Sequence, residues 1–158
     1  MKTIILYETR TGFTEECAQN MHKHIPGSVL KDIHEEDYSL EDFDTVLVGA
    51  PIYVGEIEHY TSRFFQRKKR KLMDKRLGIF CAGMNTAEFN LAVQTSLPPD
   101  IFYHAQIVHC GGKIDYKSLS LKDKFTVRRR LGLKENKEIH NELKVEEFLK
   151  WVNEKEAK

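Results

Sequence analysis

The sequence predicts an α/β fold in which helices cover both faces of a parallel β-sheet. Short apolar runs rich in β-branched residues occupy 3–7, 28–33, 45–50, 77–81 and 106–110. Helical patterns lie between or after them, at 15–24, 59–71, 87–95 and 145–153. Strands that alternate with helices form parallel βαβ units, and the sheet they build is buried beneath helices on both sides. We therefore expect three layers: helices, sheet and helices.

The bulk composition is that of a water-soluble globular protein. The 158 residues are 41% hydrophobic and 31% charged, which fits one domain over 1–158 with a single core. The formal net charge of +1 creates no field that would attract nucleic acid, so nucleic-acid binding is not expected. No apolar run approaches the length of a membrane span, and the N-terminus lacks a signal-peptide pattern. We expect a cytoplasmic protein.

The cysteines and histidines predict no metal or disulfide site. Cys17, Cys81 and Cys110 are scattered, odd in number and form no C-x-x-C motif. Such usage fits a reducing cytosol better than a disulfide framework or a zinc centre. His22 and His24 face apart on the first expected helix, so they are not expected to bind a metal. His59, His104 and His109 have no carboxylate or cysteine at ligand spacing and are expected to be surface or packing histidines.

The connection between the first expected strand and the first helix is the strongest candidate site. Free backbone amides and the positive end of the helix dipole converge there, and hydroxyl groups add donors. The chain has neither G-x-x-x-x-G-K-[ST] nor G-x-G-x-x-G, so the loop suits a single phosphate better than a triphosphate or a dinucleotide. The alternative is a helix N-cap without a ligand. The candidate residues are Thr9, Arg10, Thr11, Gly12, Phe13 and Thr14.

The T-x-T-G-x-T pattern of this loop resembles the FMN phosphate loop of flavodoxins. The resemblance implies FMN as cofactor and a three-layer fold whose five-stranded parallel sheet has the order 2-1-3-4-5. In that topology the ligand lies beyond the C-terminal ends of the strands, at the switch point between strands one and three. The loop after strand three should therefore carry site residues as well.

The segment after the third expected strand resembles the second flavin loop of the same superfamily. Proline should end the hydrogen-bond ladder there, and glycine permits unusual backbone angles. The resemblance implies that Tyr53 stacks on the flavin ring; the alternative is a turn whose tyrosine caps the core. The candidate residues are Pro51, Ile52, Tyr53, Val54 and Gly55.

A third loop follows the fourth expected strand. Its small residues and amide donors, Ala82, Gly83, Met84 and Asn85, are expected to approach the pyrimidine edge of a flavin. Flavodoxins often carry an acidic residue and a stacking tyrosine in this loop, and this chain has neither. Stacking would then depend on Tyr53, with Met84 as a second contact.

The segment at 111–135 is longer than a connection between the last strand and the last helix requires. Its G-G-x-x-x-Y-x-x-L-x-x-x-D pattern resembles the flavodoxin-domain branch that includes menaquinone-dependent protoporphyrinogen oxidase. We expect a short basic helix in 119–131, with Leu119, Leu121, Phe125 and Val127 on one apolar side. Such a helix suits peripheral contact with an acidic lipid surface or an acidic partner. The alternative is a plain solvated helix. Its basic residues are Lys122, Lys124, Arg128, Arg129 and Arg130.

Two functions follow from the resemblance, and the sequence leaves both open. The first is an FMN-dependent oxidoreductase that acts on a quinone or a porphyrinogen. The second is a non-enzymatic electron carrier that serves redox partner proteins. The late basic segment favours the enzyme, because a bare carrier does not need it. The sequence identifies no catalytic residue and no oligomeric state. A response regulator is excluded. Response regulators of this topology carry an aspartate at the end of the third strand, where this chain has Ala50 and Pro51.

Overall fold

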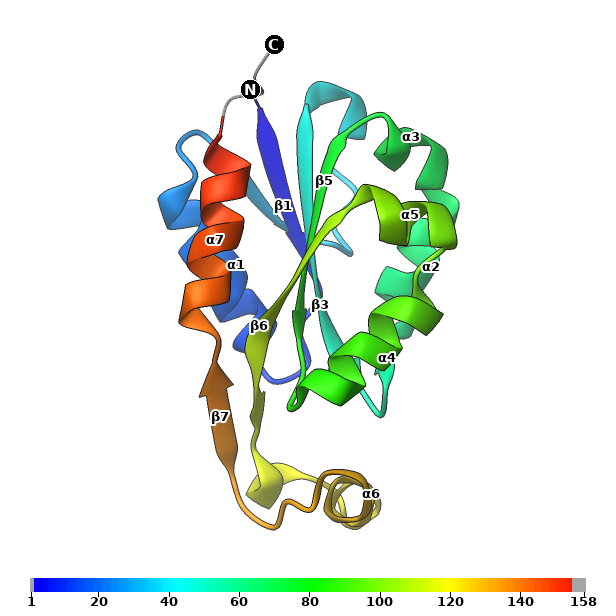
Figure 1. Ribbon diagram of the computed structural model, residues 1–158, viewed down its shortest axis with the longest axis vertical. Coiled ribbons are helices and arrows are strands. Elements are labelled where there is room, and N and C mark those ends of the chain that lie inside the picture. The colour runs from blue at the N-terminus through cyan, green and yellow to red at the C-terminus, as the bar shows by residue number, and fades with distance from the viewer. Residues whose placement is uncertain (1, 155–158) are drawn as a thin grey trace.

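The computed structural model describes residues 2–154, which form one sheet between two layers of helices (Figure 1). Met1 and 155–158, which the expected 1–158 domain includes, lie outside the described residues. The strands are β1 (Thr3–Tyr7), β2 (Val29–Asp32), β3 (Thr45–Tyr53), β4 (Glu56–Ile57), β5 (Arg76–Ala82), β6 (Gln106–Ile114) and β7 (Lys137–His140). The helices are α1 (Phe13–His24), α2 (His59–Arg67), α3 (Lys69–Met73), α4 (Thr86–Ser96), α5 (Pro99–His104), α6 (Leu121–Leu131) and α7 (Glu142–Asn153), with single 3-10 turns at Leu40–Asp42 and Tyr116–Ser118.

The sheet confirms the expected fold class. Its order is β2-β1-β3-β5-β6-β7, and the first five strands are parallel, which is the predicted 2-1-3-4-5 arrangement. Two further strands are antiparallel additions that the sequence did not predict: β4 pairs with β3, and β7 pairs with β6. The first has only two residues, and the second is mostly charged and exposed, so neither shows a strand-like apolar run.

The helices also differ from expectation in two places. The helix expected at 59–71 is divided at Lys68 into α2 and α3. The short helix α5 was not expected, because it has only six residues. It begins at Pro99, and proline is favoured at the first helical position. No helix in the described part of the chain is long and apolar enough to cross a membrane.

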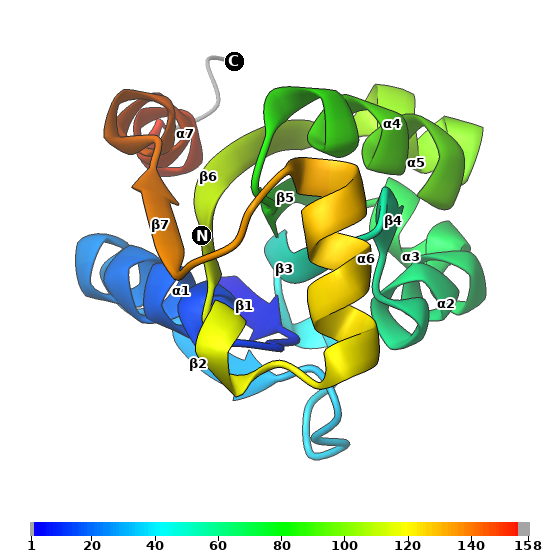
Figure 2. The ribbon, with the colours of Figure 1, turned by 90° about the horizontal axis from the view of Figure 1, so that it is seen from below.

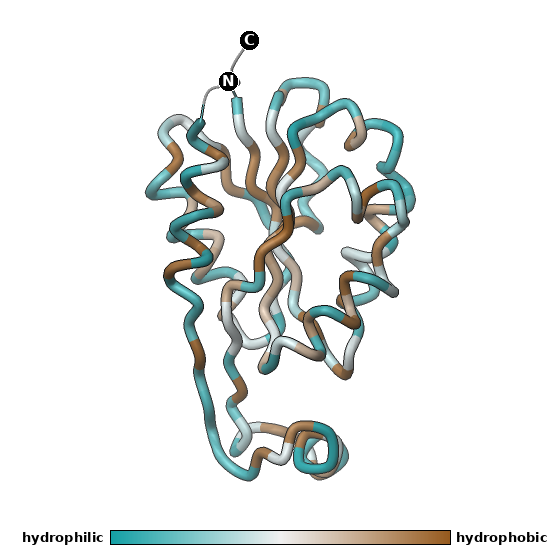
Figure 3. The backbone as a smooth tube through the Cα atoms, viewed as in Figure 1, coloured by the Kyte–Doolittle hydropathy of each residue, from teal (hydrophilic) through white to brown (hydrophobic). Residues whose placement is uncertain are grey.

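The core has two halves because side chains alternate across the sheet. Helices α1 and α7 cover one face, and α2 to α5 cover the other (Figure 1). Brown, hydrophobic residues accordingly follow the central strands in Figure 3. The face toward α2 to α5 buries strand residues such as Ile4, Leu6, Val46, Val48 and Ile79. The face toward α1 and α7 buries Ile5, Leu47, Phe80 and Val108.

The expectation that Pro51 ends the third strand is wrong. Strand β3 continues to Tyr53, and Pro51 stays in register with Ala82 of β5. The Gly49 carbonyl accepts the Glu8 N–H at 2.9 Å, and Pro51 faces the same side of the strand two residues later. Strand β1 has already ended at Tyr7 there, so the missing proline N–H costs no bond to β1, and the Pro51 carbonyl accepts the Glu58 N–H at 3.1 Å instead.

Strand β6 extends past the sheet and carries α6 at its far end. The ladder between β5 and β6 ends where Ala82 pairs with Gly111, and β6 then pairs only with β7. The resulting two-stranded ribbon places α6 below the C-terminal ends of the parallel strands (Figure 1), and Figure 2 shows this helix lying across them. Ser120 caps the start of α6 by accepting the Asp123 N–H at 3.2 Å, and Gly132 ends it with φ 68°.

Candidate functional site

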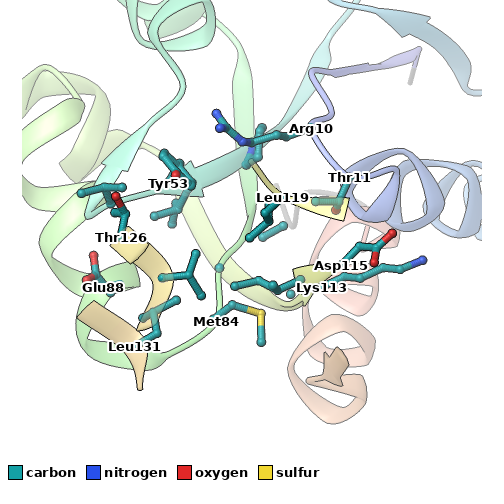
Figure 4. A pocket seen from close by; sticks show the side chains of 18 of the residues that line it. Arg10, Thr11, Tyr53, Met84, Glu88, Lys113, Asp115, Leu119, Thr126 and Leu131 are labelled. Carbon is teal, nitrogen blue, oxygen red and sulfur yellow. The ribbon is translucent and has the colours of Figure 1, made fainter. Parts of the chain in front are cut away.

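A cavity of about 440 Å³ lies between the C-terminal ends of the parallel strands and α6. It is at the β1/β3 switch point, where ligands bind in open α/β sheets. Figure 4 shows side chains from all three predicted loops around it, together with residues of the α6 region. The predicted residues that line it are Arg10, Thr11, Thr14, Pro51, Ile52, Tyr53, Val54, Ala82, Gly83 and Met84. Thr9, Gly12, Phe13, Gly55 and Asn85 do not line it.

The first loop is held by its own hydroxyl groups. The Gly12 N–H donates to Thr9 Oγ1 at 3.0 Å, and the Phe13 N–H donates to Thr11 Oγ1 at 3.4 Å. Gly12 has φ 88°, a conformation that glycine adopts without strain. The Phe13 side chain is 1% exposed and belongs to the core, so only its backbone faces the loop. The predicted residues thus divide into two that shape the turn, one core residue and three that line the cavity.

The N-terminus of α1 offers backbone donors beside Thr14. The Glu16 N–H makes the first helical hydrogen bond, to the Gly12 carbonyl at 3.0 Å. The Thr14 and Glu15 amides therefore lie outside the helical ladder, where they suit an anionic ligand, whereas the Phe13 amide already donates to Thr11. Thr14 is 1% exposed and also lines the cavity, so its hydroxyl and these amides are available to the same anion.

The second loop is a tight hairpin with a strained residue. Val54 (φ 54°) and Gly55 (φ 74°) connect β3 to β4, and both have the positive φ that a type I′ turn requires. For a β-branched valine this conformation costs on the order of 1–3 kcal/mol. Gly55 is also closely packed, since a Cβ there would lie 2.8 Å from Glu88 Oε2. The strained Val54 lines the cavity, whereas the predicted Gly55 does not line it and packs against Glu88.

Tyr53 joins the first loop to α6. The Arg10 guanidinium lies 3.8 Å from the centre of its ring, and its hydroxyl donates to Asp123 Oδ1 at 2.8 Å. Burial and the hydrogen bond to Asp123 raise the pKa of the Tyr53 phenol above its ordinary value. Arg10 also forms an ion pair with Glu58 at 2.8 Å. A planar ligand that stacks on Tyr53 would use the ring face opposite Arg10 or displace the guanidinium.

The third loop is fixed by contacts behind the cavity. The Asn85 side chain accepts the Glu88 N–H at 2.7 Å and so caps α4, which explains why it does not line the cavity. The Gly83 N–H donates to the Gly111 carbonyl at 2.7 Å. His109, which sequence reasoning treated as a packing residue, has Nε2 2.6 Å from the Gly83 carbonyl oxygen. Gly83 and Met84 are thus presented to the cavity by a loop tied to β6.

The roof of the cavity is the part that sequence reasoning missed. We use "roof" for 115–131, the chain from the end of β6 through α6. Val127 lies on the inner side of α6 and is 3% exposed. The Arg130 guanidinium lies 3.3 Å from Glu88 Oε1. The Glu88 Oε2 atom is buried without a hydrogen-bond partner among the described residues. The lining residues outside the predicted set are Glu88, Gly112, Lys113, Ile114, Asp115, Ser118, Leu119, Thr126, Val127, Arg130 and Leu131.

The expected short basic helix is present, but its apolar residues do not share one side. Leu119 and Val127 line the cavity, whereas Leu121 and Phe125 are 85% and 63% exposed. Positions 121 and 125 are one turn apart, and position 127 falls on the opposite face of the helix. The i, i+4 spacing of Val127 and Leu131 was the sequence signal for the inward face. The helix therefore has an inner apolar face and an outer face with two exposed apolar side chains.

Other candidate chemistry is weak in the described part of the chain. No group of three His, Cys, Asp or Glu side chains that could hold a metal ion occurs there. The three cysteines are free thiols, and burial raises the pKa of Cys81 to about 12. A thiol with such a pKa is protonated at neutral pH and is a poor nucleophile. The cavity is therefore the site to which the sequence loops and the structure both point.

Comparison with known proteins assigns the family. The flavodoxin domain model matches residues 4–139, whereas no curated protein matches the sequence. A flavoprotein from Lactobacillus acidophilus NCFM, solved in complex with FMN, has a TM-score of 0.54 at 17% identity, covering 68% of this chain and 91% of that one. A WrbA-like flavodoxin from Agrobacterium tumefaciens has a TM-score of 0.53 at 19% identity, covering 80% and 90%. These structures share the fold, and by the family match over most of its length the chain belongs to the flavodoxin domain family.

Proposed function

We propose that the protein binds FMN noncovalently in the roofed cavity and transfers electrons through it. The observation that carries this proposal is the convergence of the three predicted loops on one cavity of about 440 Å³ at the β1/β3 switch point. FMN is the ligand of the L. acidophilus relative, and the fold is shared. Bound FMN would supply the one- and two-electron chemistry, while the protein binds and orients it.

The residues at the two ends of the cavity fit the two parts of FMN. Thr11, Thr14 and the first amides of α1 present hydroxyl and N–H donors, which suit a phosphate monoester. Ile52 and Met84 also line the cavity and would provide apolar contact for a flat ring. Arg10 adds a positive charge near the phosphate end, although Glu58 already pairs with it. We infer that Arg10 turns from Glu58 toward the phosphate when FMN binds.

The test is to identify the cofactor. Purified protein should be yellow, with the visible absorption of a flavin, and the flavin released on denaturation should migrate as FMN and not as riboflavin or FAD. If the preparation is colourless, apoprotein is titrated with FMN under fluorescence detection. Absence of binding in that titration would overturn the proposal, and so would release of FAD alone.

The covered cavity favours an enzyme over a carrier. A carrier exposes the edge of its cofactor to partner proteins. Here α6 lies across the strand ends (Figure 2), and its buried Val127 lines the cavity. We propose that the redox substrate is a small molecule that reaches the cavity beside the roof: a quinone as electron acceptor or a porphyrinogen as electron donor. The narrower resemblance to quinone-linked protoporphyrinogen oxidases rests on the sequence pattern at 111–123. A non-enzymatic carrier serving redox partner proteins is the second candidate, favoured by the exposed Leu121 and Phe125.

Electron exchange with different small molecules and with a redox protein separates the two candidates. A water-soluble quinone and a porphyrinogen turnover assay represent the enzyme, and a redox protein of similar potential represents the carrier's partner. Faster oxidation by the quinone, or porphyrinogen turnover, supports the enzyme. Oxidation by the redox protein alone, slowed by Leu121→Gln and Phe125→Gln, would replace the enzyme with the carrier.

The outer face of α6 also supports peripheral contact with an anionic lipid surface, where a lipid-soluble quinone would reside. Leu121 and Phe125 project from it beside Lys122, Arg128 and Arg129, which are exposed as well. Vesicles rich in phosphatidylglycerol should retain the protein in a sedimentation assay more strongly than phosphatidylcholine vesicles do. The Leu121→Gln/Phe125→Gln variant should lose this difference. Leu143→Gln, which alters an exposed leucine on α7, is the matched control and should retain it.

A further inference from the structure

His109 is a buried histidine with one defined hydrogen bond. It lies on β6, is 2% exposed, and places Nε2 2.6 Å from the Gly83 carbonyl oxygen. A carbonyl oxygen only accepts, so Nε2 carries the hydrogen and Nδ1 is the bare nitrogen of the neutral ring. Nδ1 is itself buried without a partner among the described residues. The contact therefore selects a single tautomer.

The surroundings of His109 hold this ring neutral and in one orientation. Burial lowers the pKa of the His109 imidazole, which favours the neutral ring with a bare Nδ1. The ring stacks on Phe89 of α4, with centroids 4.8 Å apart and planes 12° from parallel. The Asn141 side chain donates to the His109 carbonyl at 2.9 Å, so the backbone is fixed as well.

The carbonyl that His109 holds belongs to the cavity wall. Gly83 lines the cavity, its N–H donates to the Gly111 carbonyl, and a Cβ at Gly112 would lie 2.5 Å from the Gly83 oxygen. The Gly83 oxygen is thus directed toward β6. In a trans peptide the next N–H points the opposite way. The Met84 N–H therefore points away from β6, and it has no acceptor among the described residues.

We propose that His109 is a positioning residue: its Nε2–H holds the Gly83 carbonyl so that the Met84 N–H faces the cavity and donates to a ring carbonyl or ring nitrogen of the bound ligand. The ligand class is a planar heterocycle with an acceptor at its edge. The inference rests on the proposed function for the identity of that ligand, FMN. It assigns to His109 an action through Gly83 and no direct contact with the ligand.

Two substitutions separate the hydrogen bond of His109 from its stacking. His109→Phe keeps an aromatic ring against Phe89 but removes the donor, whereas His109→Gln keeps an N–H donor of similar reach but removes the ring. Loss of a neutral hydrogen bond corresponds to roughly a threefold to tenfold weaker FMN affinity. We expect this loss, with a shifted visible spectrum of bound flavin, in His109→Phe and a recovery of both in His109→Gln.

His104→Phe is the matched control. His104 is an exposed histidine on α5 whose Nε2 lies 2.7 Å from the Lys75 backbone oxygen, so the same type of contact is removed elsewhere. If the wild type binds FMN and His109→Phe has the affinity and spectrum of His104→Phe, the positioning role is overturned. If the wild type binds no FMN at all, the proposed function itself is overturned.

The tautomer of His109 provides a readout that needs neither a variant nor a ligand. Nitrogen-15 NMR of the unliganded wild-type protein distinguishes a protonated Nε2 from a protonated Nδ1. The positioning role of His109 requires the Nε2–H form, with the Nδ1 signal at the position of an unprotonated ring nitrogen. A dominant Nδ1–H form or an imidazolium at neutral pH would overturn the inference even if His109→Phe fails to fold.

Discussion

The 9–14 loop and the α6 roof line the same cavity from opposite sides, but different contacts hold them. In the loop, Gly12 and Thr9 bond across three residues, and the helix that follows begins at once. In the roof, the hydrogen bond from Tyr53 to Asp123 spans 70 residues, and the Arg130 contact with Glu88 spans 42. The loop is thus built by its own sequence, whereas the roof depends on side chains from β3 and α4.

Because the loop is held by local contacts and the roof by distant ones, we expect the loop to be preorganised and the roof to open. Hydrogen bonds within a tight turn at a helix start do not depend on distant elements, so the loop should keep its shape whether or not a ligand is present. The roof is attached by two buried side chains, Tyr116 and Val127, and by a few partly exposed polar contacts. Segments with few buried apolar contacts open at low free-energy cost. Substitutions at the two ends should therefore have different consequences.

The largest effect is expected at the loop. Thr14→Ala removes a buried hydroxyl from a proposed phosphate site, and hydrogen bonds to charged groups contribute about 1.5–3 kcal/mol, or roughly tenfold to over a hundredfold in affinity. Calorimetric titration should show weaker FMN binding with little change for riboflavin, which lacks the phosphate. Thr14→Ser, which keeps the hydroxyl, is the control. Equal losses for FMN and riboflavin would mean that the loop does not hold the phosphate.

A smaller effect is expected at the roof. Tyr53→Phe removes the hydroxyl that bonds to Asp123 but keeps the ring beneath Arg10. Loss of this hydrogen bond should lower the free-energy cost of opening the roof by about 0.5–1.5 kcal/mol. The open population of α6 should then rise roughly threefold to tenfold. Limited trypsin digestion measures this opening through cleavage after Arg128 and Arg129. Tyr103→Phe, at an exposed tyrosine on α5, should leave the rate unchanged. The attachment is disproved if both variants are cleaved at the wild-type rate.

The same hydrogen bond predicts how the roof responds to alkaline pH. Because folding raises the pKa of Tyr53, its contribution to stability is fully present below the ordinary value of 10.0 and is lost as the pH rises through the raised value. A tyrosinate beside the Asp123 carboxylate would repel it. Hydrogen exchange of α6 should therefore rise above about pH 10 in the wild type, beyond the chemical dependence on hydroxide. Tyr53→Phe should show no such step. A step of equal size there would assign it to another tyrosine, because burial also raises the pKa of Tyr7 and of Tyr38 to about 12.

The smallest effect is expected at Arg130. The Arg130 side chain is 42% exposed. Ion pairs of such exposed groups contribute about 0–1 kcal/mol to stability and weaken with salt. Arg130→Gln should raise the trypsin sensitivity of the remaining α6 sites less than Tyr53→Phe does, and the difference from wild type should diminish in high salt. An effect larger than that of Tyr53→Phe would mean that the buried Glu88 oxygen makes the pair stronger than its exposure suggests.

The sequence predicted the fold and the locally built part of the site for the same physical reason. Strand residues such as Ile4 and Val48 are apolar because both faces of the sheet are covered, and Thr9 and Gly12 form a turn within six residues. Local patterns of this kind can be read without knowing what packs against them. Most of the three-loop candidates accordingly line the cavity.

The roof could not be placed in this way. Val127 and Phe125 are both apolar residues of one basic helix, and only the ribbon of β6 and β7 decides which of them turns inward. Asn85 was read as a ligand donor although its side chain caps α4, and Pro51 was read as the end of a strand whose neighbour had already ended. Each of these roles depends on residues far away in the sequence.

One measurement addresses the central claim that a single ligand contacts both the preorganised loop and the roof. Hydrogen–deuterium exchange is followed by mass spectrometry in apoprotein, with FMN and with riboflavin. FMN should protect peptides covering 9–14 and 119–131 together, whereas riboflavin should protect the roof and leave the loop nearly unchanged. Protection by FMN at the loop without the roof, at the roof without the loop, or at neither would contradict the account.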